Sequence, residues 1–199
     1  MVAALNRAED GGTKPPHSSK DQVAKARWSK RLADGCAVAI ANEFRRIKSL
    51  QSQTIRPDAD GKKSEPLTRL SGSSNKSKRI DVTVVDPLAG LHIGVSCKGF
   101  NFLDVGGENY DKNMSGRFYE LADEMRLVHE HLPRAFLAAV LFLPLPASRD
   151  KGKRSSFAHM VVELRERTNP ADPSLPRVPG KCDMGWVARY AEGDEPEGF

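Results

Sequence analysis

Three polar side chains are brought together by the strongest strand pattern in the chain. Residues 80–86 (IDVTVVD) and 91–98 (LHIGVSCK) read as strands, and the PLAG segment between them reads as a turn. In a hairpin with this four-residue turn, Asp81 faces Ser96. Successive strand residues alternate between the two faces of a sheet, so Asp81, Ser96 and Lys98 share one face. The hairpin therefore presents a carboxylate, a hydroxyl and an ammonium group together at one end.

The two faces of this hairpin differ in polarity, which supports the register. A pairing of Asp86 with Leu91 leaves only apolar side chains on one face, and a pairing one residue off would mix the two faces. The apolar face carries Ile80, Val82, Val84, Leu91, Ile93, Val95 and Cys97, and the other carries Asp81, Thr83, Val85, His92, Gly94, Ser96 and Lys98. A carboxylate and an ammonium group this close form either a structural ion pair or part of a reactive site.

The stretch RIDVTVVDPLAGLHIGVSCKGFNF (79–102) resembles the core of the PD-(D/E)XK nucleases, which have the restriction-endonuclease-like fold. In that family an Asp begins one strand of a hairpin and a (D/E)xK tripeptide ends the next. The resemblance places Asp81 at the first position and Ser96-Cys97-Lys98 at the tripeptide. Ser96 thus stands where the family has a metal-binding carboxylate, so another acid must replace it.

A subset of restriction enzymes with this fold has the same Ser-x-Lys and takes the missing carboxylate from an Arg-x-x-Glu element on the following helix. Here the matching residues are Arg117 and Glu120, on a predicted helix over 115–131. Arg117, Glu120 and Glu124 lie on one stripe of that helix, beside its apolar stripe. The resemblance implies that Glu120 reaches back to the sheet. A surface ion pair of Glu120 with Arg117 or Arg126 is the alternative.

A second glutamate lies on the first predicted helix, where the family often carries one. Glu43 sits three residues after Ile40 and four before Ile47, within an apolar stripe. A carboxylate on such a face is costly unless it is paired or coordinates something. By resemblance Glu43 binds metal through water or holds a second ion, and the alternative is a salt bridge with a base such as Arg46.

The resemblance implies phosphodiester hydrolysis with Mg²⁺. Asp81 and Glu120 would supply ligand oxygens and the backbone carbonyl of Cys97 a third, because hard cations take several oxygen ligands. Lys98 would orient the attacking water and neutralise the scissile phosphate, and Ser96 would hydrogen-bond a metal-bound water. This chemistry needs no organic cofactor.

The remaining patterns predict an α/β domain with a mixed sheet. By resemblance this is the restriction-endonuclease-like arrangement of a mixed central sheet flanked by helices. We expect a flexible N-terminal arm over 1–20 and a single nuclease-like domain over 21–199 with an acidic C-terminal tail. The predicted elements besides the hairpin are helices at 21–50, 115–131 and 155–168, a strand buried on both faces at 135–143, and a last strand at 184–190.

Length and composition exclude several classes. The chain of 199 residues suits one domain, and its longest apolar run, 135–143, is too short to span a bilayer. The N-terminus does not read as a secretory signal, and three separated cysteines without a CxxC pair fit a reducing cytoplasm. The commonest phosphate-loop, serine-hydrolase and zinc-protease motifs are absent from the sequence.

Charge is unevenly distributed and points to a polyanion. Between Arg45 and Ile80, ten Lys and Arg stand against three acids, although the whole chain has a net charge of only +5. This stretch either contacts phosphates or forms a solvated loop. The predicted DNA contacts lie near the site or in a second basic segment: Arg117, Asn109, Asn113, Lys151 and Lys153.

We therefore expect a magnesium-dependent endonuclease for double-stranded DNA, in particular a cytoplasmic restriction enzyme that acts as a homodimer on a palindromic site. A repair or recombination nuclease of the same fold is one alternative. The other is a non-catalytic nucleic-acid-binding protein in which Ser96 reflects a degenerate site.

Overall fold

The fold is seen in a computed structural model that describes residues 22–60, 79–103, 108–150, 154–172 and 174–191. The arm predicted over 1–20 and the acidic tail after residue 191 lie outside these ranges. Most of the basic segment between Arg45 and Ile80, residues 61–78, also lies outside them.

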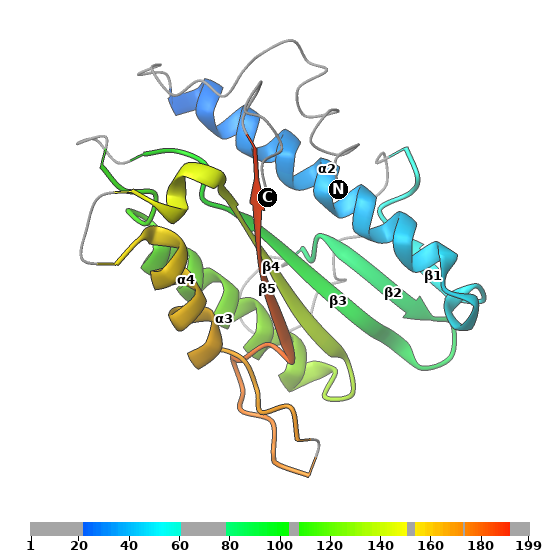
Figure 1. Ribbon diagram of the computed structural model, residues 1–199. Coiled ribbons are helices and arrows are strands. Elements are labelled where there is room, and N and C mark those ends of the chain that lie inside the picture. The colour runs from blue at the N-terminus through cyan, green and yellow to red at the C-terminus, as the bar shows by residue number, and fades with distance from the viewer. Residues whose placement is uncertain (1–21, 61–78, 104–107, 151–153, 173, 192–199) are drawn as a thin grey trace.

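A five-stranded mixed sheet forms the centre of the molecule (Figure 1). Its spatial order equals its chain order, β1-β2-β3-β4-β5, with antiparallel pairing from β1 to β3 and parallel pairing from β3 to β5. The predicted α/β class with a mixed sheet is therefore confirmed. The strands are β1 (Thr54–Arg56), β2 (Val82–Asp86), β3 (Gly90–Gly99), β4 (Phe136–Pro144) and β5 (Met184–Tyr190).

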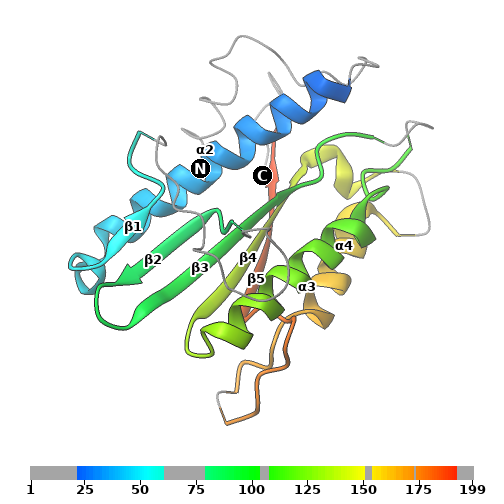
Figure 2. The same cartoon turned by 180° about the vertical axis from the view of Figure 1, so that it is seen from behind.

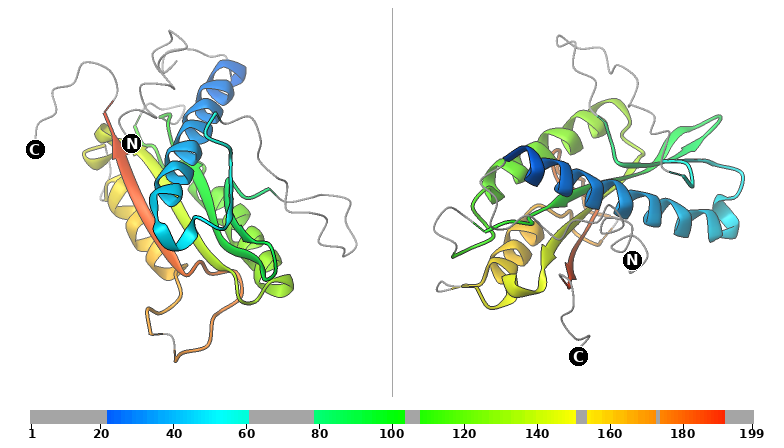
Figure 3. Two further views of the ribbon diagram at one scale, coloured as in Figure 1. Left: turned by 90° about the vertical axis from the view of Figure 1, so that its right-hand side faces the viewer. Right: turned by 90° about the horizontal axis from the view of Figure 1, so that it is seen from above.

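Helices cover both faces of the sheet, as the view along it shows (Figure 3). Helix α2 (Gln22–Arg46) packs on one face, and α3 (Met114–His131) and α4 (Ser156–Glu166) pack on the other. Two short 3₁₀ turns, η1 (Lys48–Leu50) and η2 (Leu145–Ser148), follow α2 and β4. None of the helices in the described ranges is long and apolar enough to cross a membrane.

The β2–β3 hairpin has the predicted register over most of its length. Val82 pairs with Val95 and Val84 pairs with Ile93, in the register that sets Asp81 against Ser96. Nearer the turn a β-bulge shifts the pairing by one residue, so that Leu91 faces Val85. A bulge reverses which face the following residues occupy.

One consequence is a correction to the predicted faces of the hairpin. Leu91 packs against the α3 side with Val85, not with Val82 and Val84 on the α2 side. Ile80, which precedes β2, also packs on the α3 side. The strands are thus buried from both sides, and the polar end of the hairpin is enclosed rather than exposed.

The buried face of α2 carries Trp28 and Leu32 in the first half of the helix and mostly small residues in the second half. Ala37 and Ala41 are buried with Leu32 and Cys36, because small side chains let the helix approach the sheet closely. Ile47, predicted to continue the apolar stripe, lies just after the helix and is 43% exposed. The stripe of large apolar residues predicted from the sequence therefore no longer coincides with the buried face near the C-terminal end of α2.

Strand β1 lies in the basic stretch that the sequence predicts to contact phosphates or to form a solvated loop. Its three residues pair with β2, and Arg45 of α2 fixes the segment by donating to the backbone carbonyls of Ile55 and Pro57. This part of the basic stretch thus holds the fold together.

Candidate active site

Three side chains from two elements meet in a buried polar cluster on the α3 side of the sheet. Ser96 Oγ donates to Oε2 of Glu124 at 2.7 Å, and Lys98 Nζ donates to Oε1 of the same carboxylate at 2.7 Å. Ser96 is fully buried, and the Lys98 and Glu124 side chains are 14% and 10% exposed. Both oxygens of Glu124 are therefore fixed by the two polar residues of the Ser-x-Lys tripeptide.

Helix α3 places Glu124 at this point because the residue belongs to its buried stripe. Leu121, Met125 and Val128 surround it at helical spacing and are all buried. Strand β3 supplies Ser96 and Lys98 from one face, since they are two residues apart. The charged carboxylate is tolerated in the core because it receives a charged and a neutral hydrogen bond.

Asp81 completes the cluster from the residue before β2. Its Oδ2 accepts a hydrogen bond from the backbone N–H of Cys97 at 2.7 Å. Burial raises the pKa of the Asp81 carboxyl above its ordinary value, while the Cys97 N–H and the Lys98 charge oppose the rise. The negative charge of Glu124 adds to the rise in the pKa of Asp81, so the two carboxylates act on each other.

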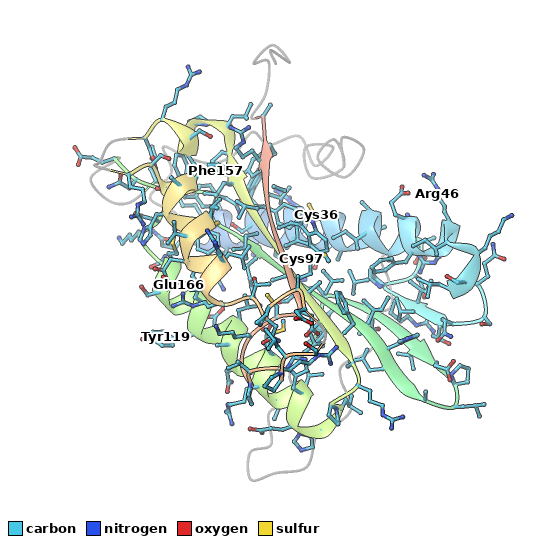
Figure 4. All side chains as sticks on the ribbon, turned by 60° about the horizontal axis from the view of Figure 1, so that its bottom comes forward. Cys36, Arg46, Cys97, Tyr119, Phe157 and Glu166 are labelled. Carbon is cyan, nitrogen blue, oxygen red and sulfur yellow. The ribbon has the colours of Figure 1, made fainter. Side chains whose placement is uncertain are left out.

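Cys97 contributes its backbone to this site, not its thiol. The side chain is buried in the core cluster beneath α2, in the same cluster as Cys36 (Figure 4). Burial raises the pKa of the Cys97 thiol well above its ordinary value, which makes it inert as a nucleophile. This confirms the prediction that Cys97 faces the apolar side of the hairpin.

Glu120 does not reach the sheet. Its side chain is 52% exposed and accepts a hydrogen bond from Arg117 at 2.9 Å, the surface pair considered above as the alternative. Tyr119, its neighbour, projects from the outer side of α3 (Figure 4). The structure instead brings Glu124 to the tripeptide, one turn further along the same helix. The motif Arg-x-x-Glu indicated Glu120, whereas the helical spacing of the buried residues indicates Glu124.

Glu43 also lies outside the cluster. Its side chain is 68% exposed and paired with Arg46 at 2.9 Å. The residues of α2 near the cluster come from the first half of the helix, up to Ala33. Ten residues of helix separate Ala33 from Glu43, a distance of about 15 Å along the axis. The structure thus gives Glu43 the salt bridge named above as the alternative.

A hollow of about 500 Å³ opens beside the cluster and is lined by Asp81, Cys97 and Lys98. Of the predicted DNA contacts, Arg117 and Asn113 line this hollow, and Asn109 lies in the segment that leads to α3 without lining it. Lys151 and Lys153 lie outside the described residues.

The donor set of the cluster suits a hard divalent cation. Mg²⁺ keeps several waters and is bound in proteins through one or two carboxylates together with substrate phosphates, so Asp81 and Glu124 are enough. The described residues hold no group of three or more His, Cys, Asp or Glu that could bind an ion without such help. The mutual repulsion between the buried Glu124 and the half-buried Asp81 is a cost that a bound cation removes.

Comparisons with known proteins add no assignment. No protein-family model, curated protein or solved structure matches this chain.

Proposed function

We propose that this chain is a magnesium-dependent endonuclease that hydrolyses phosphodiester bonds of double-stranded DNA. The observation that carries the proposal is the convergence of Asp81, Ser96, Lys98 and Glu124 at the edge of a cationic hollow. Asp81 and Lys98 line the hollow, and the buried Glu124 lies behind Lys98. Two carboxylates and one ammonium group are the groups that phosphodiester hydrolysis needs.

Asp81 and Glu124 would hold the metal, with the backbone carbonyl of Cys97 as a third ligand. Bound there, Mg²⁺ supplies Lewis-acid polarisation of the phosphate and lowers the pKa of a water. Glu124 thus takes the role that the resemblance gave to Glu120.

The residues of the chain position the reactants. Lys98 is held by Glu124 at the end of β3 and lines the hollow, so its ammonium group faces an entering phosphate. There it orients the attacking water and neutralises charge on the phosphate oxygens. Ser96 fixes the second oxygen of Glu124, which holds the carboxylate in one orientation.

The mixed sheet with α2 on one face and α3 and α4 on the other supports a restriction-endonuclease-like arrangement for this proposal. Within it we favour a restriction enzyme that acts as a homodimer on double-stranded DNA. A repair or recombination nuclease would use the same four residues, and mapping the cleaved ends separates the two, because a restriction enzyme cuts at one sequence.

The test is plasmid nicking in Mg²⁺ by the wild type, Asp81→Asn, Glu124→Gln and Glu120→Gln. We expect the first two variants to lose about 100-fold or more in rate, equivalent to roughly 2.7 kcal/mol of barrier. Glu120→Gln is the matched control, with the same chemical change one turn away on α3, and should cut like the wild type. Full activity of Glu124→Gln would refute the proposal.

A non-catalytic nucleic-acid-binding protein is the second candidate. It is favoured by one observation, that both oxygens of Glu124 are already engaged by Ser96 and Lys98. In this reading the cluster is a structural ion pair. Binding of DNA without cleavage in Mg²⁺, Mn²⁺ or Ca²⁺ would favour it.

A further inference from the structure

The hollow beside the candidate site lies between the first half of α2 and the start of α3. Residues 100–103, which follow β3, lie between these two helices, as seen from behind in Figure 2. The lining of the hollow contains five Lys and Arg and a single acid, Asp81. Such a surplus of positive charge around the entrance to the cluster attracts an anion.

The cations stand on two opposite sides. Lys25 and Lys30 come from α2, while Arg117 comes from the first turn of α3 and Lys112 from the segment just before it. Lys98, from the end of β3, lies at the candidate site itself. The sequence analysis did not predict the two α2 lysines at this site. Helix α2 lies well before the hairpin in the chain and comes close to it only in the folded protein.

The ion pairs that these cations form are exposed, so the same side chains can also bind an anionic ligand. Lys30 pairs with Asp34 at 2.7 Å and Arg117 pairs with Glu120 at 2.9 Å, and all four side chains are about half exposed or more. Exposed pairs of this kind contribute little to stability, so exchanging the carboxylate for a phosphate costs little. The Lys25 Nζ lies 5.3 Å from the ring centroid of Phe102, which keeps this side chain at the hollow.

We propose, resting on the proposed function, that Lys25 and Lys30 of α2 on one side, and Lys112 and Arg117 just before and in the first turn of α3 on the other, form a two-walled phosphate track. The track holds the backbone of the strand that is cut, on both sides of the phosphate at Lys98. Lys and Arg contacts to phosphates position a duplex but carry no base information. The track therefore binds nucleic acid by charge, independently of base sequence.

The test measures binding without cleavage, by fluorescence anisotropy of a labelled duplex in EDTA over a range of salt concentrations. The variants are Lys25→Gln/Lys30→Gln and Lys112→Gln/Arg117→Gln. Each lost phosphate contact lowers the slope of log affinity against log salt by about 1. We expect each double variant to bind more weakly, with a slope smaller by about 2. Two unrelated duplexes of equal length should give the same slopes.

The matched control is Arg134→Gln/Arg165→Gln, which removes the same charge from exposed residues outside the hollow. It should bind like the wild type, and Lys25→Arg/Lys30→Arg should restore binding. Wild-type affinity and slope in the α2 variant, or an equal loss in the control, would overturn the track. A wild type that binds no duplex would overturn it as well.

The two proposals fail separately in this design. A protein that binds through both walls and never cuts in Mg²⁺ refutes the nuclease and leaves the track in place. A protein that cuts in Mg²⁺, with binding unaffected by the α2 substitutions, refutes the track and leaves the nuclease.

Discussion

Replacing Glu124 by Gln should destabilise the protein even in the absence of metal and DNA. The substitution keeps the shape of the side chain and removes the charge that partners Lys98 at 2.7 Å. Breaking a buried ion pair by removing one partner costs about 3–5 kcal/mol. Lys98 also lines the hollow, where water reaches it, and Ser96 can still donate to the amide oxygen. We therefore expect the low end of that range, about 3 kcal/mol.

Thermal denaturation at pH 7 in EDTA measures this loss. For a chain of this size 1 kcal/mol corresponds to roughly 2–4 °C, so the melting temperature of Glu124→Gln should fall by roughly 6–12 °C. Glu120→Gln removes an exposed partner of Arg117 and should stay within about 0.5 kcal/mol of the wild type. Equal melting temperatures for the wild type and Glu124→Gln would refute the buried cluster. In a Lys98→Met background the same substitution should cost far less.

Three further outcomes follow from the site. Asp81→Asn should be more stable than the wild type at pH 7 without metal. The raised pKa means that the folded protein favours the neutral form of the Asp81 carboxyl. The wild type is therefore most stable below the ordinary pKa of 3.8 and loses stability as the pH rises through the pKa of the folded state. Urea denaturation should show this advantage vanishing toward pH 3. Adding 10 mM Mg²⁺ should reduce this advantage of Asp81→Asn, because an ion that bound with a Kd of about 1 mM would stabilise only the wild type, by about 1.4 kcal/mol. Finally, Ser96→Asp/Glu124→Ser exchanges the two positions of the carboxylate and should nick plasmid faster than Ser96→Asp alone.

Local patterns predicted most of the fold. The helix at 115–131 and the strand at 184–190 fall within one residue of α3 and β5, because the periodicity of their apolar residues marks their extent. The hairpin register followed from polarity alone up to the bulge near the turn. A β-bulge leaves no polarity pattern in the sequence, so it was not predicted. Strand β1 has only three residues, which is too short to show alternation.

The candidate site was predictable in its strand half. Ser96 and Lys98 follow from alternation along one strand, and Asp81 follows from the register of the hairpin. Asp81 is held there by the backbone N–H of Cys97 and interacts with the charge of Lys98, although Ile80 beside it leaves the face that alternation predicts. The helical half depends on the rotation of α3 against the sheet, which sequence motifs do not fix. Glu124 was recognisable as an acid at helical spacing from Leu121 and Val128, and its burial in that stripe is what selects it over Glu120.

The error at Glu43 has a different cause. Large apolar residues suggested a buried stripe through Ile40, Phe44 and Ile47, yet α2 approaches the sheet through Ala37 and Ala41. Small residues carry little weight in a hydrophobic pattern, although they allow the closest packing. The helix face predicted to be buried was therefore rotated about the axis of α2 relative to the face that packs against the sheet.

The most direct test of the site is a crystal structure of the protein soaked in Mn²⁺, with data that reveal the anomalous signal of the ion. We predict one strong peak between the carboxylates of Asp81 and Glu124, which disappears in Glu124→Gln and remains in Glu120→Gln. A peak held by other residues, or no peak at these carboxylates in the wild type, would contradict the assignment of Glu124 as the replacement acid.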